Sequence, residues 1–222
     1  MLIYAHRGLH GDAQENTMDS FFRAEKAGLD GIETDLRTTR DGQVVLFHDR
    51  TVRGEAVANL TYADLLDLSG ISVPTLEHVL TYDWHIAWNF EFKTTASVVQ
   101  SIPLLRKAMP KEVMFSSFIH AAVRHAVDEL GGEGALLTAS LPMDDTMLPH
   151  PTPGIRTLVW DWNVATPDAF EDAEAVGWRN MVYGPVTRGE HEALTVLRPH
   201  AVITDHPSLI ARNTNVADGE RR

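Results

Sequence analysis

The sequence contains no cysteine, which excludes disulfide bonds and is typical of a protein kept in a reducing compartment. It also has no run of about 18 apolar residues, so no transmembrane helix is expected. Met1 is not followed by the basic stretch and apolar core of a signal peptide. Together these absences predict a soluble, cytoplasmic protein without a stable membrane anchor.

Basic residues are scarce compared with acidic ones. The 222 residues include 19 Lys and Arg against 31 Asp and Glu, a net charge of −12. Nucleic acids and anionic membrane surfaces attract basic patches, so this balance argues against either as a partner. The length is enough for one substantial core. We therefore expect a single domain over residues 1–222 with a flexible polar tail at 213–222, compatible with a monomer or a homo-oligomer.

Strand and helix patterns alternate along the chain. Apolar or alternating runs predict strands at Leu2–Ala5, Ile32–Leu36, Trp88–Lys93, Val113–Ser117, Ala135–Thr138, Thr157–Trp162, Asn180–Tyr183 and Ala201–Thr204. Helical spacing predicts helices at Met18–Ala27, Leu60–Leu68, Leu76–Leu80, Ala96–Met109, His120–Leu130, Pro167–Val176, Glu190–Leu197 and Pro207–Arg212, and residues 140–153 are expected to form a loop.

Eight strands alternating with helices predict an α/β fold, a (β/α)₈ TIM barrel with a small hairpin and loop insertion after the second strand. The main alternative is an open doubly wound sheet. However, no G-x-G-x-x-G sequence follows the first strand.

Two strands carry charged residues at alternate positions. Glu33 and Asp35 share one strand face, and so do Glu91 and Lys93. Neighbouring carboxylates repel each other, and hard cations such as Mg²⁺ or Ca²⁺ bind oxygen ligands of this kind. Glu91 is then a candidate third metal ligand, and Lys93 is a candidate cation for an anionic substrate. The ordinary alternatives are a solvated strand face and a surface salt bridge.

A histidine is expected beside this acidic pair. Asp41 and Gly42 predict a two-residue hairpin turn, and counting outward from it pairs Asp35 with His48. A longer or bulged loop would shift this register.

Reactive residue types also follow the predicted strands. In (β/α)₈ barrels the active site lies at the C-terminal ends of the strands. The residues at or just past those ends are His6, Arg7, Asp35, Lys93, Ser117, Trp162 and Asp205. His10, in the loop after His6, is equally compatible with the rim of a site and with an ordinary surface position.

Several short motifs occur in a fixed order between Ala5 and Pro207. They read AHRG, ENT, IETDL, DG-x-VV-x-x-HD, FEFK and ITD-x-P. This ordered set resembles the glycerophosphodiester phosphodiesterase family over nearly the whole chain. The resemblance implies a metal-dependent barrel that splits glycerophosphodiesters, as small-molecule substrates, into glycerol 3-phosphate and an alcohol.

The resemblance also implies roles for individual residues. His6 and His48 would form the general acid and base pair. One divalent cation, Mg²⁺ or Ca²⁺, would bind Glu33, Asp35 and Glu91. Substrate contacts would come from Arg7 and Lys93 at the phosphate, with Glu15 in support.

The sequence departs from the family pattern at three positions. Gln14 stands where the family often has proline, and Gly184 and Thr187 replace a Trp and an Asn. Trp162 is a candidate substrate contact in their place. The headgroup is left open, and the short insertion predicts an open pocket with modest selectivity. The alternatives are a related phospholipase D-type enzyme acting on lysolipids or sphingolipids, and a non-enzymatic binding module.

Overall fold

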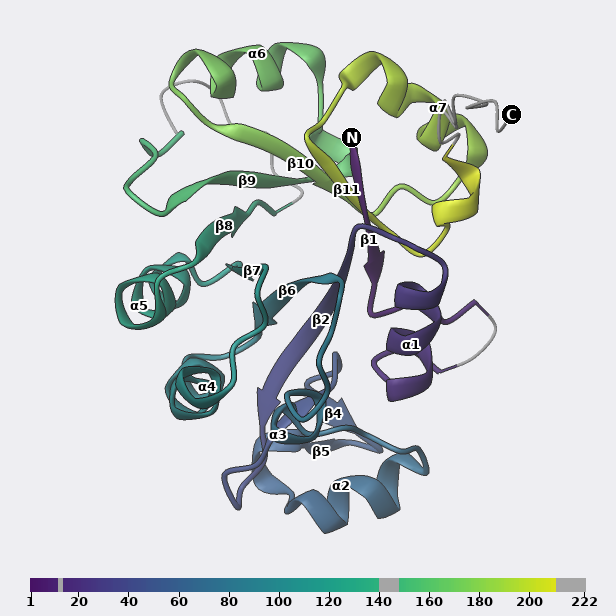
Figure 1. Cartoon of the computed structure of the whole chain (residues 1–222), viewed down its shortest axis with the longest axis vertical. Helices are drawn as coiled ribbons and strands as arrows, with labels where there is room; N and C mark the ends of the chain where they lie inside the picture. The colour runs from purple at the N-terminus through teal and green to yellow at the C-terminus, as the bar shows by residue number, and fades with distance from the viewer. Residues whose placement is uncertain (12–13, 140–147, 211–222) are drawn as a thin grey trace, which may run out of the picture.

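The computed structural model describes residues 1–11, 14–139 and 148–210, and eight parallel strands form a closed barrel in it. The barrel strands are β1 (Leu2–His6), β2 (Gly31–Thr38), β6 (Ala87–Phe92), β7 (Val113–Ser117), β8 (Glu133–Leu137), β9 (Ile155–Asp161), β10 (Arg179–Tyr183) and β11 (Ala201–Thr204). Each pairs with its neighbour, and pairing of β1 with both β11 and β2 closes the ring (Figure 1). The predicted (β/α)₈ barrel is confirmed.

Helices lie around the outside of the barrel (Figure 1). They are α1 (Met18–Lys26), α4 (Thr95–Lys107), α5 (His120–Leu130), α6 (Pro167–Ala175) and α7 (Arg188–Leu197). Four of the five begin after a threonine whose hydroxyl accepts a hydrogen bond from the first turn, as at Thr17 and Thr187. The local sequence therefore sets where these helices start.

One predicted helix contains a proline, and another prediction needs correction. A proline inside a helix can kink or break it, but α4 runs through Pro103. Pro103 and Val99 both lie on the solvent face, so the Val99 carbonyl that loses its helical donor can bond to water. The described part of the predicted helix at residues 207–212 is a 3₁₀ turn, η3 (Pro207–Leu209), and residues 211–212 lie outside the described residues. The predicted tail at 213–222 and part of the predicted loop at 140–153 lie outside the described residues.

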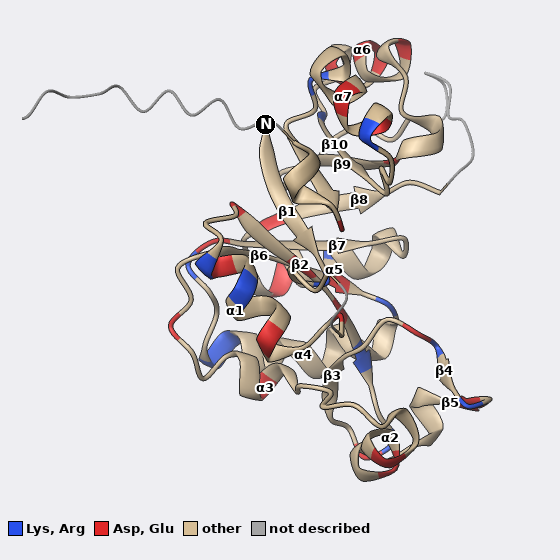
Figure 2. Cartoon of the chain, turned by 90° about the vertical axis from the view of Figure 1, so that its right-hand side faces the viewer, with Lys and Arg blue, Asp and Glu red and all other residues tan. Residues whose placement is uncertain are grey.

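The segment between β2 and β6 forms the expected insertion. It contains β3 (Val44–Leu46), which pairs antiparallel with β2, the hairpin of β4 (Thr51–Val52) and β5 (Glu55–Ala56), a 3₁₀ turn η1 (Val57–Asn59), and helices α2 (Tyr62–Ser69) and α3 (Leu76–Val79). Its own small core includes Val45, Leu65 and Val73. In Figure 2, α2, β4 and β5 project at one end of the molecule.

Strand alternation divides the core into an inner and an outer part. Inward-facing side chains fill the barrel, among them Tyr4, Met114 and Val159. Outward-facing side chains such as Trp88 and Trp160 pack in the two clusters between the strands and the helices. Side chains alternate strictly along a strand, so every second residue from these inward-facing positions also faces the barrel axis. This alternation identifies the inward-facing residues at the C-terminal end of the barrel.

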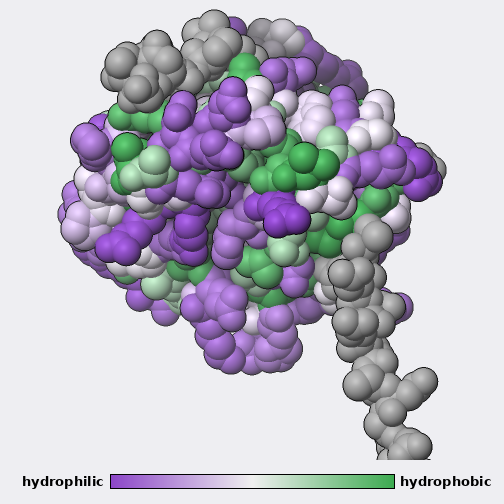
Figure 3. Space-filling model, turned by 90° about the horizontal axis from the view of Figure 1, so that it is seen from above, coloured by the Kyte–Doolittle hydropathy of each residue, from purple (hydrophilic) through white to green (hydrophobic). Residues whose placement is uncertain are grey.

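In the described part of the chain, no helix combines the length and apolar character needed to cross a bilayer. The face seen in Figure 3 has hydrophobic side chains interspersed among hydrophilic ones.

Candidate active site

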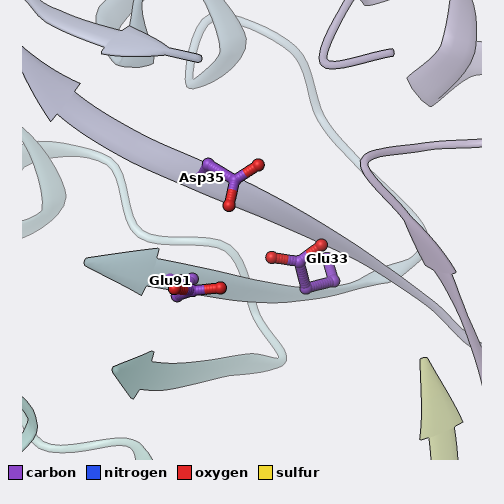
Figure 4. Close-up of side chains that lie close together, drawn as sticks. All are labelled: Glu33, Asp35 and Glu91. Atoms are coloured by element: carbon purple, nitrogen blue, oxygen red, sulfur yellow. The ribbon is translucent and has the colours of Figure 1, made fainter. Parts of the chain in front are cut away.

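Three buried carboxylates meet at the C-terminal end of the barrel. Glu33 and Asp35 come from β2 and Glu91 from β6, and the strand register places Asp35 directly beside Glu91. One oxygen from each lies within 4.8 Å of the others. Figure 4 shows that they point into a common space from two neighbouring strands. The expected shared face of these residues is thus an inward face, and we call the three residues the acidic triad.

Burial and mutual repulsion shift the pKa values of the acidic triad. Burial, then the charge of Asp35, raises the pKa of Glu33 to about 8. Burial also raises the pKa of Glu91. Although burial alone would raise the pKa of Asp35, Lys93 and Arg7 lower it. The Oε1 atom of Glu33 is buried without a hydrogen-bond partner among the described residues. These oxygens could hold a hard metal ion.

Two basic side chains contact the acidic triad. Lys93 Nζ lies 2.9 Å from Asp35 Oδ1 and 2.6 Å from Glu91 Oε1. Arg7 Nε lies 3.3 Å from Asp35 Oδ2, and Arg7 Nη1 donates to both oxygens of Glu15 at 2.8 and 2.9 Å. The structure therefore brings Arg7, Glu15 and Lys93 together with the triad.

Asn16 also belongs to the site, although the sequence pattern did not indicate its role. It precedes Thr17, the N-cap residue of α1. Asn16 donates from Nδ2 to Asp35 Oδ2 at 2.8 Å and accepts at Oδ1 from Thr34 Oγ1 at 2.6 Å. Its left-handed backbone, at φ 52°, turns the side chain toward β2. The only signal in the sequence was its place in the ENT motif.

His6, which ends β1, lies between Asp205 and Glu33. Its Nδ1 lies 2.8 Å from Asp205 Oδ1, and its Nε2 lies 3.9 Å from Glu33 Oε2. Burial lowers the pKa of His6, but Asp205 and Glu33 together raise it above its ordinary value. The same Asp205 oxygen lies 3.1 Å from His10 Nε2, which places His10 beside this histidine. Asp205 was noted only for its position past a strand end.

The predicted pairing of His48 with Asp35 is wrong by one residue. The loop comprises Arg40, Asp41 and Gly42, and Thr39 rather than Arg40 bonds to Gln43. Leu36 pairs with Leu46, and Phe47 N donates to Asp35 O at 3.0 Å.

His48 follows β3 instead of pairing within it. Its Nδ1 lies 2.9 Å from Asp49 Oδ1, and its side chain is 35% exposed. A positive charge on His48 would lower the pKa of both Asp35 and Glu91, so the ring is within electrostatic range of the triad.

Trp162 follows β9, and Tyr183 ends the neighbouring strand β10. Trp162 is half-buried and packs against the outer core cluster that contains Trp160. The Tyr183 hydroxyl lies 3.1 Å from Asp161 Oδ2 and 3.1 Å from Thr138 O. Burial and the charge of Asp161 raise the pKa of Tyr183. Strand parity already indicated that Asp161 and Tyr183 face inward, although neither was singled out.

Comparison with known proteins identifies the family. Residues 6–209 match the model of the glycerophosphoryl diester phosphodiesterase family. The chain belongs to this family. It is 34% identical over 146 residues to a glycerophosphodiester phosphodiesterase from Caldanaerobacter subterraneus, covering 55% of this chain and 60% of that protein. It is 32% identical over 153 residues to a probable glycerophosphodiester phosphodiesterase 2 from Mycobacterium tuberculosis, covering 61% and 58%. The chain thus spans about 60% of the length of these two relatives.

Solved structures of family members share the fold. A glycerophosphodiester phosphodiesterase from Parabacteroides distasonis has a TM-score of 0.81 at 24% identity, covering 93% of both chains. A phosphodiesterase from Oleispira antarctica, in complex with the product sn-glycerol-3-phosphate, has a TM-score of 0.79 at 20% identity, covering 95% of both chains. At 24% and 20% sequence identity, these similarities show a shared fold.

Proposed function

We propose that this member of the glycerophosphodiester phosphodiesterase family hydrolyses glycerophosphodiesters to glycerol 3-phosphate and an alcohol. The observation that carries the proposal is the meeting of three buried carboxylates with Arg7 and Lys93 at the barrel mouth. The names of the curated relatives and the product-bound Oleispira structure support it.

The acidic triad would hold one divalent cation, Mg²⁺ or Ca²⁺. Both ions prefer oxygen ligands, and the unpaired Oε1 of Glu33 offers one. When bound, the ion would polarise a phosphoryl oxygen and offset charge that develops on the phosphate.

Arg7 and Lys93 would bind the phosphodiester anion. Both are already fixed by carboxylates, Arg7 by Glu15 and Lys93 by Asp35 and Glu91. Cations that are positioned before the substrate arrives stabilise developing negative charge without reorganising. Glu15 would therefore support binding by orienting Arg7.

His6 and His48 would move the protons. Because an ionised carboxylate only accepts hydrogen bonds, Nδ1 of each ring carries hydrogen toward Asp205 or Asp49 and Nε2 is left to exchange a proton. One histidine would take the proton of the attacking hydroxyl, and the other would protonate the leaving oxygen. The attacker is either water or the 2-hydroxyl of the substrate glycerol, which would give a cyclic phosphate.

Product analysis tests this proposal. The protein is incubated with glycerophosphocholine, glycerophosphoethanolamine and lysolipids, with and without chelator, and the phosphate products are identified. We expect glycerol 3-phosphate from the deacylated diesters, loss of turnover in chelator, and recovery with Mg²⁺ or Ca²⁺. Release of headgroup from lysolipids alone would favour the phospholipase D-type activity, and binding of every diester without turnover would favour a binding module.

A further inference from the structure

A hollow of about 340 Å³ lies beside the acidic triad, between the loop before α1 and the insertion. Glu15 and Asn16 form one wall. The other wall is formed by residues 47–49, which follow β3, together with Val52 of β4 and Ile71 after α2. This volume is at the lower end of the range of about 300–1,000 Å³ for small-molecule sites. The hollow therefore suits a small organic group.

The hollow adjoins the proposed reaction centre directly. Asn16 in its wall donates to Asp35 at 2.8 Å, and Glu15 holds Arg7 at 2.8 and 2.9 Å. His48, the proposed proton carrier on this side, also lines it. A phosphodiester bound by Arg7 and Lys93 can thus extend one of its two ester groups into the hollow.

The chemistry of the walls favours a cation. The described residues that line the hollow include two carboxylates, Glu15 and Asp49, and neither lysine nor arginine. Arg7 bonds to Glu15, and Asp49 Oδ1 lies 2.9 Å from His48 Nδ1. Phe47 adds an aromatic ring, and aromatic rings attract ammonium groups. Arg37 lies behind this wall, where its Nε donates to His48 O at 2.8 Å, but it does not line the hollow. The described lining itself therefore presents two carboxylates and an aromatic residue, and no lysine or arginine, to a bound group.

We propose that this hollow receives the alcohol moiety of the substrate and favours a small alcohol that carries an ammonium group. The inference rests on the proposed glycerophosphodiesterase function. The sequence led us to expect modest headgroup selectivity because the insertion is small. The proposed preference for an ammonium group differs from that expectation, because the small insertion still supplies one wall of the hollow. A neutral headgroup of similar size is accepted less well.

The test places a positive charge in the hollow. Val52→Lys is compared with Val52→Gln, which has similar length without charge, and with Val99→Lys, which adds the same charge on the exposed face of α4. The substrates are glycerophosphocholine and glycerophosphoglycerol, which share the phosphate and one glycerol. Binding is measured by calorimetry on the Mg²⁺- or Ca²⁺-loaded proteins carrying His6→Ala, which slows turnover of the esters, and kcat/KM is measured separately with His6 present.

We expect the protein with an unaltered hollow to prefer the choline ester in both measurements. Val52→Lys should reduce that preference roughly tenfold, which is the effect of a unit charge at about 10 Å in a medium of effective dielectric about 20. Val52→Gln and Val99→Lys should leave the preference within about twofold. If Val52→Lys does not fold, Ser69→Lys serves instead, since Ser69 lines the hollow at the end of α2, where a cation suits the helix dipole.

Two outcomes would overturn the inference. One is a protein with an unaltered hollow that binds both esters equally, and the other is a Val52→Lys or Ser69→Lys protein that loses affinity for both esters to the same extent. If neither ester is hydrolysed, the proposed function fails. The calorimetric preference still decides whether the hollow recognises the ammonium headgroup.

Discussion

Replacement of Asn16 by glycine tests how the acidic triad is held in place. Asn16 is 4% exposed, and its amide bonds to Asp35 at 2.8 Å and to Thr34 at 2.6 Å. Glycine adopts the required positive φ without strain, so Asn16→Gly removes both hydrogen bonds and leaves the backbone conformation available. The loss of stability then reports on the two bonds.

The expected loss of unfolding free energy can be worked out from the two hydrogen bonds, one to Asp35 and one from Thr34. A hydrogen bond to an ionised group contributes about 1.5–3 kcal/mol, and a buried hydroxyl left unpaired costs about 1–3 kcal/mol. Asp35 keeps its contacts with Arg7 and Lys93, so we expect the free energy of unfolding to fall by about 3 kcal/mol. For a domain of this size the melting temperature should drop by roughly 6–12 °C. Asn16→Ala should lose about 1 kcal/mol more, because its Cβ is strained at positive φ.

Urea and thermal unfolding of the metal-free protein in chelator measure these changes. Thr34→Val, alone and combined with Asn16→Gly, completes a double-mutant cycle. The double variant should lose less stability than the sum of the two single variants, because both remove the same hydrogen bond. An Asn16→Gly protein within about 1 kcal/mol of wild type, or strictly additive changes, would refute the reasoning.

The remaining predictions concern the proposed chemistry. Glu91→Gln keeps the side-chain volume but removes one of three carboxylates, so calorimetry should show at least roughly tenfold weaker binding of Mg²⁺ or Ca²⁺; unchanged affinity would contradict the triad as a metal site. His6→Ala and His48→Ala should each reduce turnover by roughly 10²–10⁴-fold, and the double variant should lose much less than the product of the two. Near-native turnover of either folded, metal-binding single variant would exclude that histidine. Asp205→Asn should lower kcat with little change in KM, because an amide no longer fixes the Nδ1 hydrogen of His6; an equal change in both constants would argue against a positioning role.

Local sequence patterns were enough to predict the barrel strands and which of their side chains share a face. Alternation along Gly31–Leu36 and Asn89–Lys93 was enough to put Glu33 with Asp35 and Glu91 with Lys93, because side-chain direction in a strand depends only on local backbone geometry. The alternation of eight strands with helices likewise predicted the closed barrel and its C-terminal mouth.

Which of these residues touch depends on how the strands and loops come together in the fold. The loop after β2 has three residues instead of two, and this single residue places Phe47 rather than His48 opposite Asp35. His6 meets Asp205 across nearly the whole chain only because β1 pairs with β11 and closes the barrel. Asn16 reaches Asp35 through a left-handed backbone that nothing in its neighbours required. Such contacts depend on loop length, barrel closure and packing, and none of these leaves a periodic signal in the sequence.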